Sequence, residues 1–332
     1  MEKNVLNLFD AHILRESARR FGANPALRLV SQIENFVYEG EDGQRPLILR
    51  VTHSSHRTAE AILGELDWIE YLHANGVAVP QAIGSVYGKL VEVLESGDSH
   101  FLVTAFQKLH GENIIKADAC TPAMYQKWGR ILGRMHALAK HYEPRHASYR
   151  REQWFEDDHV RHTDRYIAGQ ATILEKHRRL MGHLHALPRD KDSFGLVHTD
   201  FTDVNFFVYD QEIAAFDFDD CQYHWFAYDI AVILFDIHWL PQREMGKDEF
   251  ERYFWGHFWQ GYTRENVLDG YWLDQLPLLM KLCEMCLYVF FYIKWDFDNL
   301  EEWQRDMIKK YQDNIENDVL CLDVKAMLGA KT

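Results

Sequence analysis

The 332-residue sequence has few of the residues that mark disulfide-rich, collagen-like or disordered chains: five cysteines, eight prolines and 19 glycines, with no repeat or low-complexity run. The cysteines are odd in number and scattered, and the chain begins without a basic segment followed by an apolar one. We therefore expect reduced thiols and a cytoplasmic protein. Cys283 and Cys286 form a CxxC pair, but no second pair follows at zinc-finger spacing, so we expect them to pack within a helix.

Basic residues are also in deficit, since 36 Lys and Arg stand against 51 Asp and Glu, a formal net charge of -15. With no cationic surplus to neutralise a phosphate backbone, we expect no nucleic-acid partner. The acidic surplus is typical of a soluble surface and also suits a cationic or metal-bridged partner. The longest apolar stretch that we identify, residues 226–240, contains Asp229 and Asp236 and is too short to span a bilayer, so we expect no membrane partner.

The first third of the chain has the pattern of an antiparallel sheet with one inserted helix. β-Branched and aromatic residues are concentrated in four strand candidates, namely residues 27–38, 47–51, 89–94 and 101–106. An acidic glycine turn at residues 40–46 joins the first two and predicts a β-hairpin. Residues 56–75 carry apolar side chains at helical spacing and end at Gly76, which predicts one helix, inserted after the third strand of the sheet.

Beyond Gly111 the pattern is mainly helical, with long helix candidates at residues 122–142 and 166–187. One strand-like island, residues 195–218, interrupts it. Because no linker is visible, we expect two lobes of one unit, residues 1–106 and 107–332, with a short hinge between them. The predicted fold class is α+β and bilobal, with a small antiparallel β lobe containing one helix and a larger, mainly helical lobe.

The island carries the polar residues that suggest chemistry. If Tyr209 pairs with Ile213 around a three-residue loop, Asn205 faces Asp217 across a hairpin, with Cβ atoms roughly 4.5–5.5 Å apart. An amide oxygen and a carboxylate suit Mg²⁺. Asp200 follows an apolar strand and is placed to accept a proton near that metal. The alternative is that each polar side chain only closes its own turn.

The segment HTDFTDVN, residues 198–205, and the DFDD segment, residues 217–220, resemble the catalytic and metal-binding motifs of the aminoglycoside phosphotransferase and choline kinase family. Further similar segments are SQIENFVYEG, LILRV, the helix containing Glu65, and FAYDIA. The resemblance covers about residues 27–235 in order. It implies a protein-kinase-like fold and Mg²⁺-dependent transfer of the γ-phosphoryl group of a nucleoside triphosphate to a small-molecule hydroxyl.

Residue by residue, the resemblance implies that Asp200 is the catalytic base and that Asn205 and Asp217 are the Mg²⁺ ligands. Arg50 stands where the family usually has a phosphate-contacting lysine, and Glu65 is its implied carboxylate partner. A guanidinium can hold phosphate oxygens and a carboxylate in fixed geometry, although its reach differs from that of a lysine. The alternative for Arg50 is an ordinary strand arginine on the solvent face. We expect His198 to be a buried orienting residue instead of a base.

The nucleotide loop lacks a glycine-rich triplet, so its phosphate contacts would come from Ser31, Asn35 or backbone N–H groups. The strand that includes Ala105 and Gln107 is expected to supply the backbone groups that bind a purine edge. Both ATP and GTP remain open as the co-substrate.

Departures from protein kinases favour small-molecule acceptors. Thr202 stands where protein kinases have a catalytic-loop lysine, Asp219 stands where the DFG glycine would be, and no APE-type segment follows. A Ser/Thr protein kinase of the same fold is one alternative. A nucleotide-binding pseudokinase with a regulatory role is the other, because Arg50 and the missing glycine triplet are compatible with it.

The acceptor is expected between the catalytic loop and the C-terminal helices. The candidate residues there are Asp220, His224, Glu284, Tyr288, Tyr292, Trp295, Asp296, Asp298 and Glu302. Aromatic faces with nearby carboxylates suit a sugar or a cationic amine. An antibiotic, homoserine, an amino alcohol or a sugar all remain open, as does the oligomeric state. The alternative is that Tyr288, Tyr292 and Trp295 are a core stripe at helical spacing.

Overall fold

The structure is a computed structural model that describes residues 3–43, 45–242 and 244–329. Residue 44 of the predicted turn lies outside them. The chain divides into two compact units. Unit 1 consists of Met1–Gly111, Tyr142–Arg151 and Ala214–Asp219, and unit 2 of Glu112–His141, Glu152–Ile213 and Asp220–Thr332. The sequence predicted two continuous lobes, residues 1–106 and 107–332. In the structure, unit 1 also includes two later segments, Tyr142–Arg151 and Ala214–Asp219.

Unit 1 contains a six-stranded antiparallel sheet in the order β1-β2-β3-β6-β4, with β5 also paired to β6. Its strands are β1 (Arg28–Ser31), β2 (Phe36–Asp42), β3 (Arg45–His53), β4 (Ala82–Ile83), β5 (Glu92–Ser96) and β6 (Ser99–Gln107). All four strand candidates therefore form strands. Residues 27–38 contribute to two strands, β1 and β2, because residues 32–35 turn the chain between them, and residues 47–51 therefore lie in the third strand.

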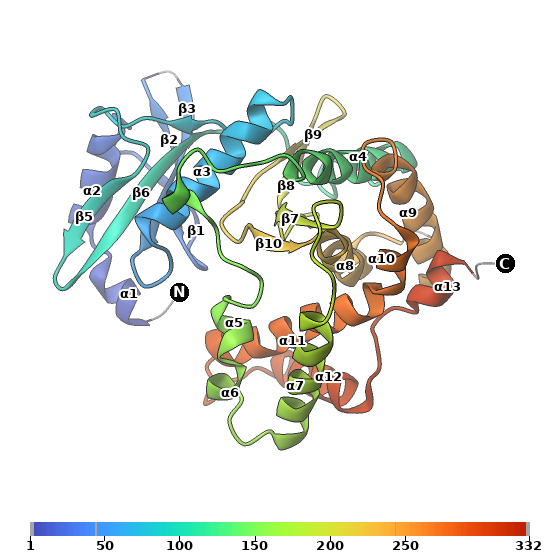
Figure 1. The fold of residues 1–332 in the computed structure, drawn as a ribbon. Coiled ribbons are helices and arrows are strands. Elements are labelled where there is room, and N and C mark those ends of the chain that lie inside the picture. Colours follow the sequence, from blue (N-terminus) through green and yellow to red (C-terminus); the bar gives the residue numbers. More distant parts are fainter. Residues whose placement is uncertain (1–2, 44, 243, 330–332) are drawn as a thin grey trace. The chain divides into compact units, whose positions relative to one another are not determined.

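Three helices accompany the sheet, α1 (Lys3–Leu8), α2 (Ala11–Arg20) and α3 (Ala59–Ala74). The predicted helix at residues 56–75 is α3. Thr58 caps its start by accepting a hydrogen bond from the Ala61 N–H, and it ends before Gly76, whose φ of +82° favours glycine. α2 packs against β3 and β5 (Figure 1).

The segment Tyr142–Arg151 belongs to unit 1 because it packs on α3. Asp67 of α3 accepts a 2.7 Å hydrogen bond from the Tyr142 hydroxyl and forms an ion pair with Arg145. The short 3-10 helix η1 (Ala147–Tyr149) approaches Gly64 so closely that an added Cβ would lie 2.1 Å from the Tyr149 carbonyl oxygen. Gly64 is therefore required for this contact.

Unit 2 is mainly helical, as expected. Its helices are α4 (Pro122–Ala139), α5 (Asp158–Arg161), α6 (Thr163–Tyr166), α7 (Ala171–His185), α8 (Phe226–Asp236), η2 (Ile237–Trp239), α9 (Lys247–Tyr262), α10 (Gly270–Asp274), α11 (Leu276–Lys294), α12 (Glu302–Asn317) and α13 (Val324–Leu328). β7 (Phe194–Val197) pairs with β10 (Gln222–Trp225) in an antiparallel ladder. β8 (Phe206–Tyr209) pairs with β9 (Glu212–Ala215), and the chain passes into unit 1 within β9.

Close helix packing supports the loop that follows β7. At Gly129 of α4, an added Cβ would lie 1.9 Å from the Phe258 carbonyl oxygen of α9, so the two backbones nearly touch. Trp128 is fully buried beside this contact and donates a 3.1 Å hydrogen bond from its indole N–H to the Phe201 carbonyl. The α4–α9 pair thus anchors the residues just after Asp200.

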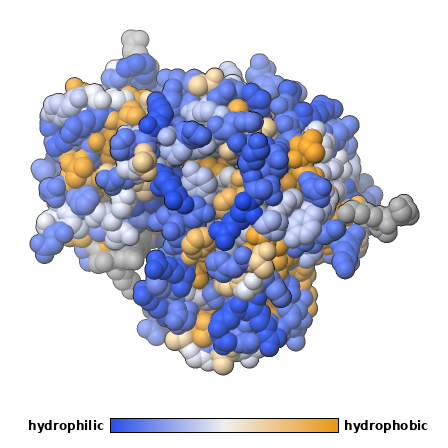
Figure 2. Space-filling view, in the orientation of Figure 1, coloured by the Kyte–Doolittle hydropathy of each residue, from blue (hydrophilic) through white to orange (hydrophobic). Residues whose placement is uncertain are grey.

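α11 is, within the described ranges, the one helix long and apolar enough to cross a membrane by length and composition. It is longer than residues 226–240, so that segment is not the longest apolar stretch of the chain. The indication is weak, because 56% of its apolar window is buried and α11 packs against α7, α8 and α12. The face drawn in Figure 2 is largely hydrophilic, with scattered hydrophobic patches.

The CxxC pair lies within α11, as we expected from the sequence. Cys283 is buried, Cys286 is half-buried, and none of the five cysteines, all of which lie in the described ranges, forms a disulfide. Burial raises the pKa of the Cys283 thiol well above its usual range, so this group is a packed apolar side chain and not a reactive thiolate.

Candidate active site

The catalytic loop in unit 2 begins directly after β7, and its backbone is held by Asp229. This carboxylate, in the first turn of α8, accepts hydrogen bonds from the backbone N–H groups of His198 and Thr199, at 3.1 and 2.7 Å. Thr199 has a φ of +68°, an uncommon conformation for a β-branched residue. A strained residue persists only where its surroundings hold it, and here Asp229 does so.

A buried hydrogen-bond chain orients Asp229 in turn. His136 of α4 is fully buried, with Nε2 3.1 Å from the Asp229 carboxylate and Nδ1 2.9 Å from the Tyr262 hydroxyl. Burial lowers the pKa of His136, so the ring is neutral. Because the Asp229 carboxylate can only accept, Nε2–H donates to it, which leaves Nδ1 to accept the proton of the Tyr262 hydroxyl, and the Tyr262 oxygen accepts from the Asn266 amide at 2.7 Å.

Asp200 and Asn205 are brought together by the same loop. The Asn205 amide donates to the Asp200 carboxylate at 2.6 Å and to its backbone carbonyl at 2.8 Å. This leaves the amide oxygen of Asn205 facing away from Asp200. His198 is buried, and its Nδ1 accepts from the Asp200 N–H at 3.3 Å, which matches the orienting role expected for it.

The hairpin after Asn205 differs from our expectation. β8 ends at Tyr209 and β9 begins at Glu212, so the loop has two residues and not three. Asp210 and Gln211 both have positive φ, which is the type I′ pattern that matches the strand twist. The predicted pairing of Tyr209 with Ile213, and the argument from it that Asn205 lies directly opposite Asp217, were therefore wrong.

The predicted Arg50–Glu65 pair is present in unit 1. Arg50, in the central strand β3, places Nη1 2.8 Å and Nη2 2.5 Å from the two carboxylate oxygens of Glu65 in α3. Both side chains are buried, so Arg50 is not a solvent-facing strand residue. Such a two-pronged contact fixes the plane of the guanidinium.

Asp219 joins this pair in a buried cluster that the sequence did not predict. Its carboxylate accepts a 2.7 Å hydrogen bond from the His56 ring and lies 3.7 Å from both Arg50 Nη1 and Arg57 Nε. Burial alone would raise the pKa of Asp219, but Arg57, His56 and Arg50 hold it well below its usual range. Asp219 is therefore ionised and serves as a counter-ion for the two arginines.

This cluster suits an anion better than a cation. Glu34, His56 and Asp219 place possible ligand atoms within 4.8 Å of one another, a spacing that a metal could use. Two guanidinium groups within 3.7 Å of the Asp219 carboxylate would oppose a metal ion there. We call Arg50, His56 and Arg57, together with Asp219, the arginine cluster.

Asp217 lies two residues before Asp219, and the two carboxylates have different surroundings. Asp217 is exposed and has a φ of +63°, whereas the intervening Phe218 and Asp219 itself are buried. The Asp217 carboxylate is close enough to raise the pKa of Arg50, although the effects of Glu65 and Asp219 are larger. An exposed carboxylate beside this cluster is suited to bind the metal ion that accompanies a nucleotide.

The residues predicted to contact the nucleotide form hydrogen bonds or strand pairs within unit 1. Asn35 is buried, donates to Asp219 at 3.2 Å and accepts from the Thr52 hydroxyl at 2.7 Å. The Gln107 N–H donates to the Gln81 carbonyl at 2.8 Å, and Ala105 pairs with β3 and β4. Ser31 ends β1, where the register shifts.

The acceptor candidates divide into buried and accessible groups. Tyr288 is fully buried and donates to Gln170 at 2.6 Å, His224 is buried and stacks on Tyr228, and Glu284 is buried beside Asn314. This favours the core alternative for Tyr288. The half-buried or exposed candidates are Asp220, Tyr292, Trp295, Asp296, Asp298 and Glu302.

Several residues at these sites were missed by sequence reasoning. His56 and Arg57 are the first two residues of the helix predicted over residues 56–75 and lie just before the observed α3, and a basic pair between a strand and a helix was their only signal. His136 and Tyr262 gave none, because an isolated histidine or tyrosine among apolar residues usually belongs to the core.

Comparison with known proteins identifies the family. Residues 26–266 match the model of the phosphotransferase enzyme family. The chain is 31% identical to an amicoumacin kinase from Bacillus subtilis (strain 168) over 321 residues, which cover 96% of this chain and 95% of the relative. The resemblance noted in the motifs is thus confirmed.

Solved structures agree. An amicoumacin kinase in complex with AMP-PNP, Ca²⁺ and Ami superimposes with a TM-score of 0.94 at 33% identity and covers 99% of both chains. A microcompartment-associated aminopropanol kinase has a TM-score of 0.73 at 22% identity, covering 92% of this chain and 95% of its own. A choline kinase from Streptococcus pneumoniae has a TM-score of 0.57 at 12% identity, covering 92% of this chain and 98% of its own, and supports the fold.

The predicted kinase-like α+β fold is confirmed. The chain belongs to the phosphotransferase enzyme family, as a kinase that transfers a phosphoryl group to an alcohol of a small molecule.

Proposed function

We propose that this kinase transfers the γ-phosphoryl group of ATP to a hydroxyl group of an amicoumacin-type antibiotic. The observation that carries the proposal is the match over 99% of both chains to the amicoumacin kinase that holds AMP-PNP, Ca²⁺ and Ami. The intact Asp200–Asn205 pair supports it, because a protein lacking these groups would have no oriented base. Five cysteines without a disulfide, three of them buried and two half-buried, and the proposed use of ATP fit a cytoplasmic location.

In this proposal Asp200 accepts the proton of the acceptor hydroxyl. Its carboxylate is half-buried and is oriented by the Asn205 amide. Phosphoryl transfer requires mainly a positioned nucleophile and stabilised charge, so this orientation matters as much as basicity. Asp229 and His136 act through the loop backbone as positioning residues.

We assign the arginine cluster to the triphosphate. Arg50 is fixed by Glu65, and Arg57 and His56 bring further hydrogen-bond donors to the same place around Asp219. In this structure the negative charge near the two arginines comes from Asp219, and a phosphate group of the nucleotide would bring negative charge to the same guanidinium groups. Cationic groups that are already fixed stabilise transferring phosphoryl oxygens without reorganising, which is the condition for large electrostatic catalysis.

We propose Mg²⁺ as the metal, held by Asn205 and Asp217. The residues fit, because Asn205 presents an amide oxygen away from Asp200 and Asp217 presents an exposed carboxylate, and both are the hard oxygen ligands that Mg²⁺ prefers. When bound with the nucleotide, the ion would neutralise phosphate charge. The Ca²⁺ named in the amicoumacin kinase complex supports the use of a divalent ion together with the nucleotide.

A phosphate-transfer assay tests the function. The purified chain is incubated with γ-labelled ATP or GTP, with Mg²⁺ or with EDTA, and with amicoumacin, an aminoglycoside, choline, homoserine or a protein substrate. We expect Mg²⁺-dependent labelling of amicoumacin from ATP. Labelling of the protein substrate alone would favour a protein kinase, and nucleotide binding without transfer to any acceptor would favour a pseudokinase.

Replacing Arg50 tests the triphosphate assignment. Arg50→Lys retains one positive charge but loses the two-pronged contact with Glu65, so we expect kcat/KM for ATP to fall about 10- to 100-fold, a loss of roughly 1.4–2.7 kcal/mol of transition-state stabilisation. Arg50→Ala leaves Glu65 buried without its partner, which is expected to cost about 3–5 kcal/mol of stability.

The matched control is Arg45→Lys, because Arg45 lies in the same strand with an exposed side chain paired to Asp42. Steady-state kinetics and thermal melting are measured for all variants. A wild-type rate in Arg50→Ala would remove Arg50 from the site, and equal losses in Arg45→Lys would point to general damage to β3.

A further inference from the structure

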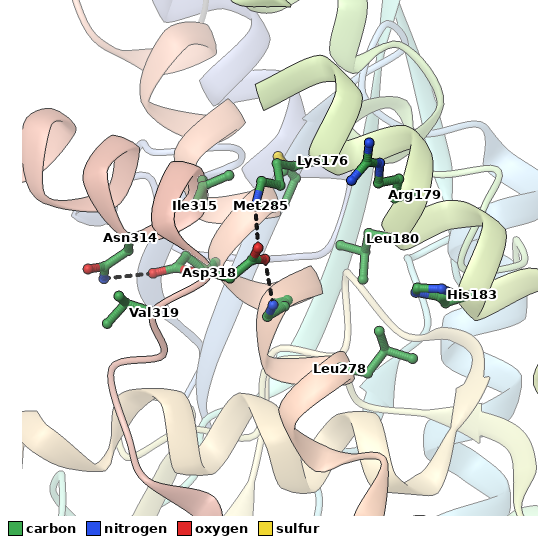
Figure 3. Close-up of a pocket in the computed structure, with 12 residues that line it drawn as sticks. Lys176, Arg179, Leu180, His183, Leu278, Met285, Asn314, Ile315, Asp318 and Val319 are labelled. Carbon is green, nitrogen blue, oxygen red and sulfur yellow. Dashed lines mark hydrogen bonds and ion pairs between the residues drawn. The ribbon is translucent and has the colours of Figure 1, made fainter. Parts of the chain in front are cut away.

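A cavity of about 260 Å³ lies within unit 2, between helices α7, α11 and α12 (Figure 3). None of its lining residues belongs to the catalytic loop or to the arginine cluster. Its lining combines cationic and apolar side chains: Lys176, Arg179, Leu180, His183, Leu278, Lys281, Glu284, Met285, Asn314, Ile315, Asp318 and Val319.

Two lysines from different helices meet at one carboxylate beside this cavity. Lys281 of α11 donates to Asp318 Oδ1 at 2.7 Å, and Lys176 of α7 contacts Oδ2 (Figure 3). Asp318 follows α12 with a φ of +57° and remains about half exposed. Arg179 also lines the cavity, although its guanidinium pairs with Glu175 outside the lining set.

The inner wall adds little negative charge. Glu284 is 2% exposed and accepts a 2.9 Å hydrogen bond from the Asn314 amide. Burial raises the pKa of Glu284 to about 7, against the opposing effects of Asn314, Lys281 and Lys310. A carboxyl group that is partly protonated at neutral pH does not cancel the charge of the lysines, so the lining is positive within a chain of net charge -15.

The lining also has an apolar part. Leu180, Leu278, Met285, Ile315 and Val319 come from α7, from α11 and from the end of α12 with the residues after it, and they are drawn among the lining residues in Figure 3. Binding pockets for small molecules combine such surfaces with a few polar groups that orient the ligand. Methionine in particular adapts its shape to different ligands.

We propose that this cavity binds a small organic anion, with a carboxylate or phosphate at Lys176 and Lys281 and an apolar body against Met285 and its neighbours. The anion would share the lysines with Asp318, which is exposed enough to turn toward solvent. No group assigned to phosphoryl transfer lines the cavity, and Glu284 is the one acceptor candidate in its lining, so binding is tested with neither nucleotide nor acceptor present.

Three probes with one carbon skeleton test the charge preference: 4-phenylbutyrate, 4-phenylbutan-1-ol and 4-phenylbutylamine. The chain is labelled with [¹³C]methyl-methionine, and the Met285 signal is assigned from Met285→Leu. Without nucleotide or acceptor present, we expect 4-phenylbutyrate to shift the Met285 signal in a saturable way. The alcohol should bind at least ten-fold more weakly, and the amine should bind more weakly still.

Variants locate the anion. The double variant Lys176→Gln/Lys281→Gln should weaken 4-phenylbutyrate binding at least ten-fold without changing its weak affinity for the alcohol. Lys309→Gln is the matched control, because Lys309 is an exposed α12 lysine that also pairs with a carboxylate, that of Asp313. Absence of a saturable Met285 shift, tighter binding of the amine, or unchanged affinity in the double variant with a native melting temperature would each overturn the proposal.

Discussion

Asp200→Ala is expected to lower the turnover number by about 10²–10⁴-fold, the range that a positioned general base contributes. Nucleotide affinity should stay within a few-fold of wild type, because the arginine cluster belongs to unit 1 and contains no part of the catalytic loop. The loss should appear in kcat and not in KM for ATP, since Asp200 acts on the acceptor hydroxyl. Single-turnover transfer and equilibrium nucleotide binding measure the two effects separately.

Asp200→Asn separates basicity from structure. An asparagine can still accept the hydrogen bond from the Asn205 amide, so the loop geometry should persist while proton acceptance is lost. The matched control is Asp192→Asn, which removes an exposed carboxylate of the same unit that lies near Lys140. Near-normal turnover in Asp200→Asn would refute the base assignment, whereas a large loss in the control would show an effect of net charge.

The sheet of unit 1 could be predicted because its strands have strong local signals. β-Branched and aromatic residues, an acidic glycine turn and a helix ending at Gly76 are all short-range patterns. The packing of Tyr142–Arg151 on α3 could not be predicted in this way. It depends on Gly64 and Asp67, which reach residues about 80 positions away in sequence, and a glycine inside a helix gives no indication of which backbone approaches it.

The candidate site shows the same division. The family motifs predicted Asp200 as the base and Arg50 and Glu65 as a pair. In the structure, Arg50 and Glu65 lie within hydrogen-bond distance of each other. The environment of Asp219 was not predicted, because its partner His56 lies 163 residues earlier. The hairpin register failed for a local reason. Asp210 and Gln211 both adopt left-handed conformations, which allow a two-residue loop. The sequence argument had assumed a three-residue loop.

Asp229 is expected to have the second largest effect on activity, although it touches no reacting group in this proposal. Asp229→Ala would remove the acceptor for two backbone N–H groups and for His136, all of them buried. Each unsatisfied buried donor costs about 1–3 kcal/mol, so a loss of several kcal/mol of stability is expected. Release of Thr199 from its positive φ should also displace Asp200, and we expect kcat to fall by at least about 100-fold.

Asp229→Asn should retain more stability than Asp229→Ala, because its amide oxygen can still accept from the Thr199 N–H. Its NH₂ group, however, would take the place of Oδ2 and face two donors, the His198 N–H and the His136 Nε2–H, so catalysis should recover only in part. A positioning role predicts that kcat falls while the affinity for nucleotide is retained in the folded variant. A variant with native stability and native kcat would exclude that role.

Asp236→Asn is the matched control, since Asp236 lies about two turns further along the same helix and, unlike Asp229, accepts no hydrogen bond from the described backbone of the catalytic loop, although Asp203 of that loop is near enough to act on it electrostatically. Burial, with a smaller contribution from Asp203, raises the pKa of Asp236 to about 6, from 3.8 in the absence of these effects. The ionised carboxylate is therefore disfavoured in the folded state, and this cost develops as pH rises from about 4 to above 6. Asp236→Asn should then be at least as stable as wild type at pH 7, with an advantage that disappears below pH 4 in thermal melts, while Asp229→Asn is less stable than wild type at pH 7. Opposite stability changes from two carboxyl-to-amide replacements in one helix would show that the effect of Asp229 comes from the loop that it holds.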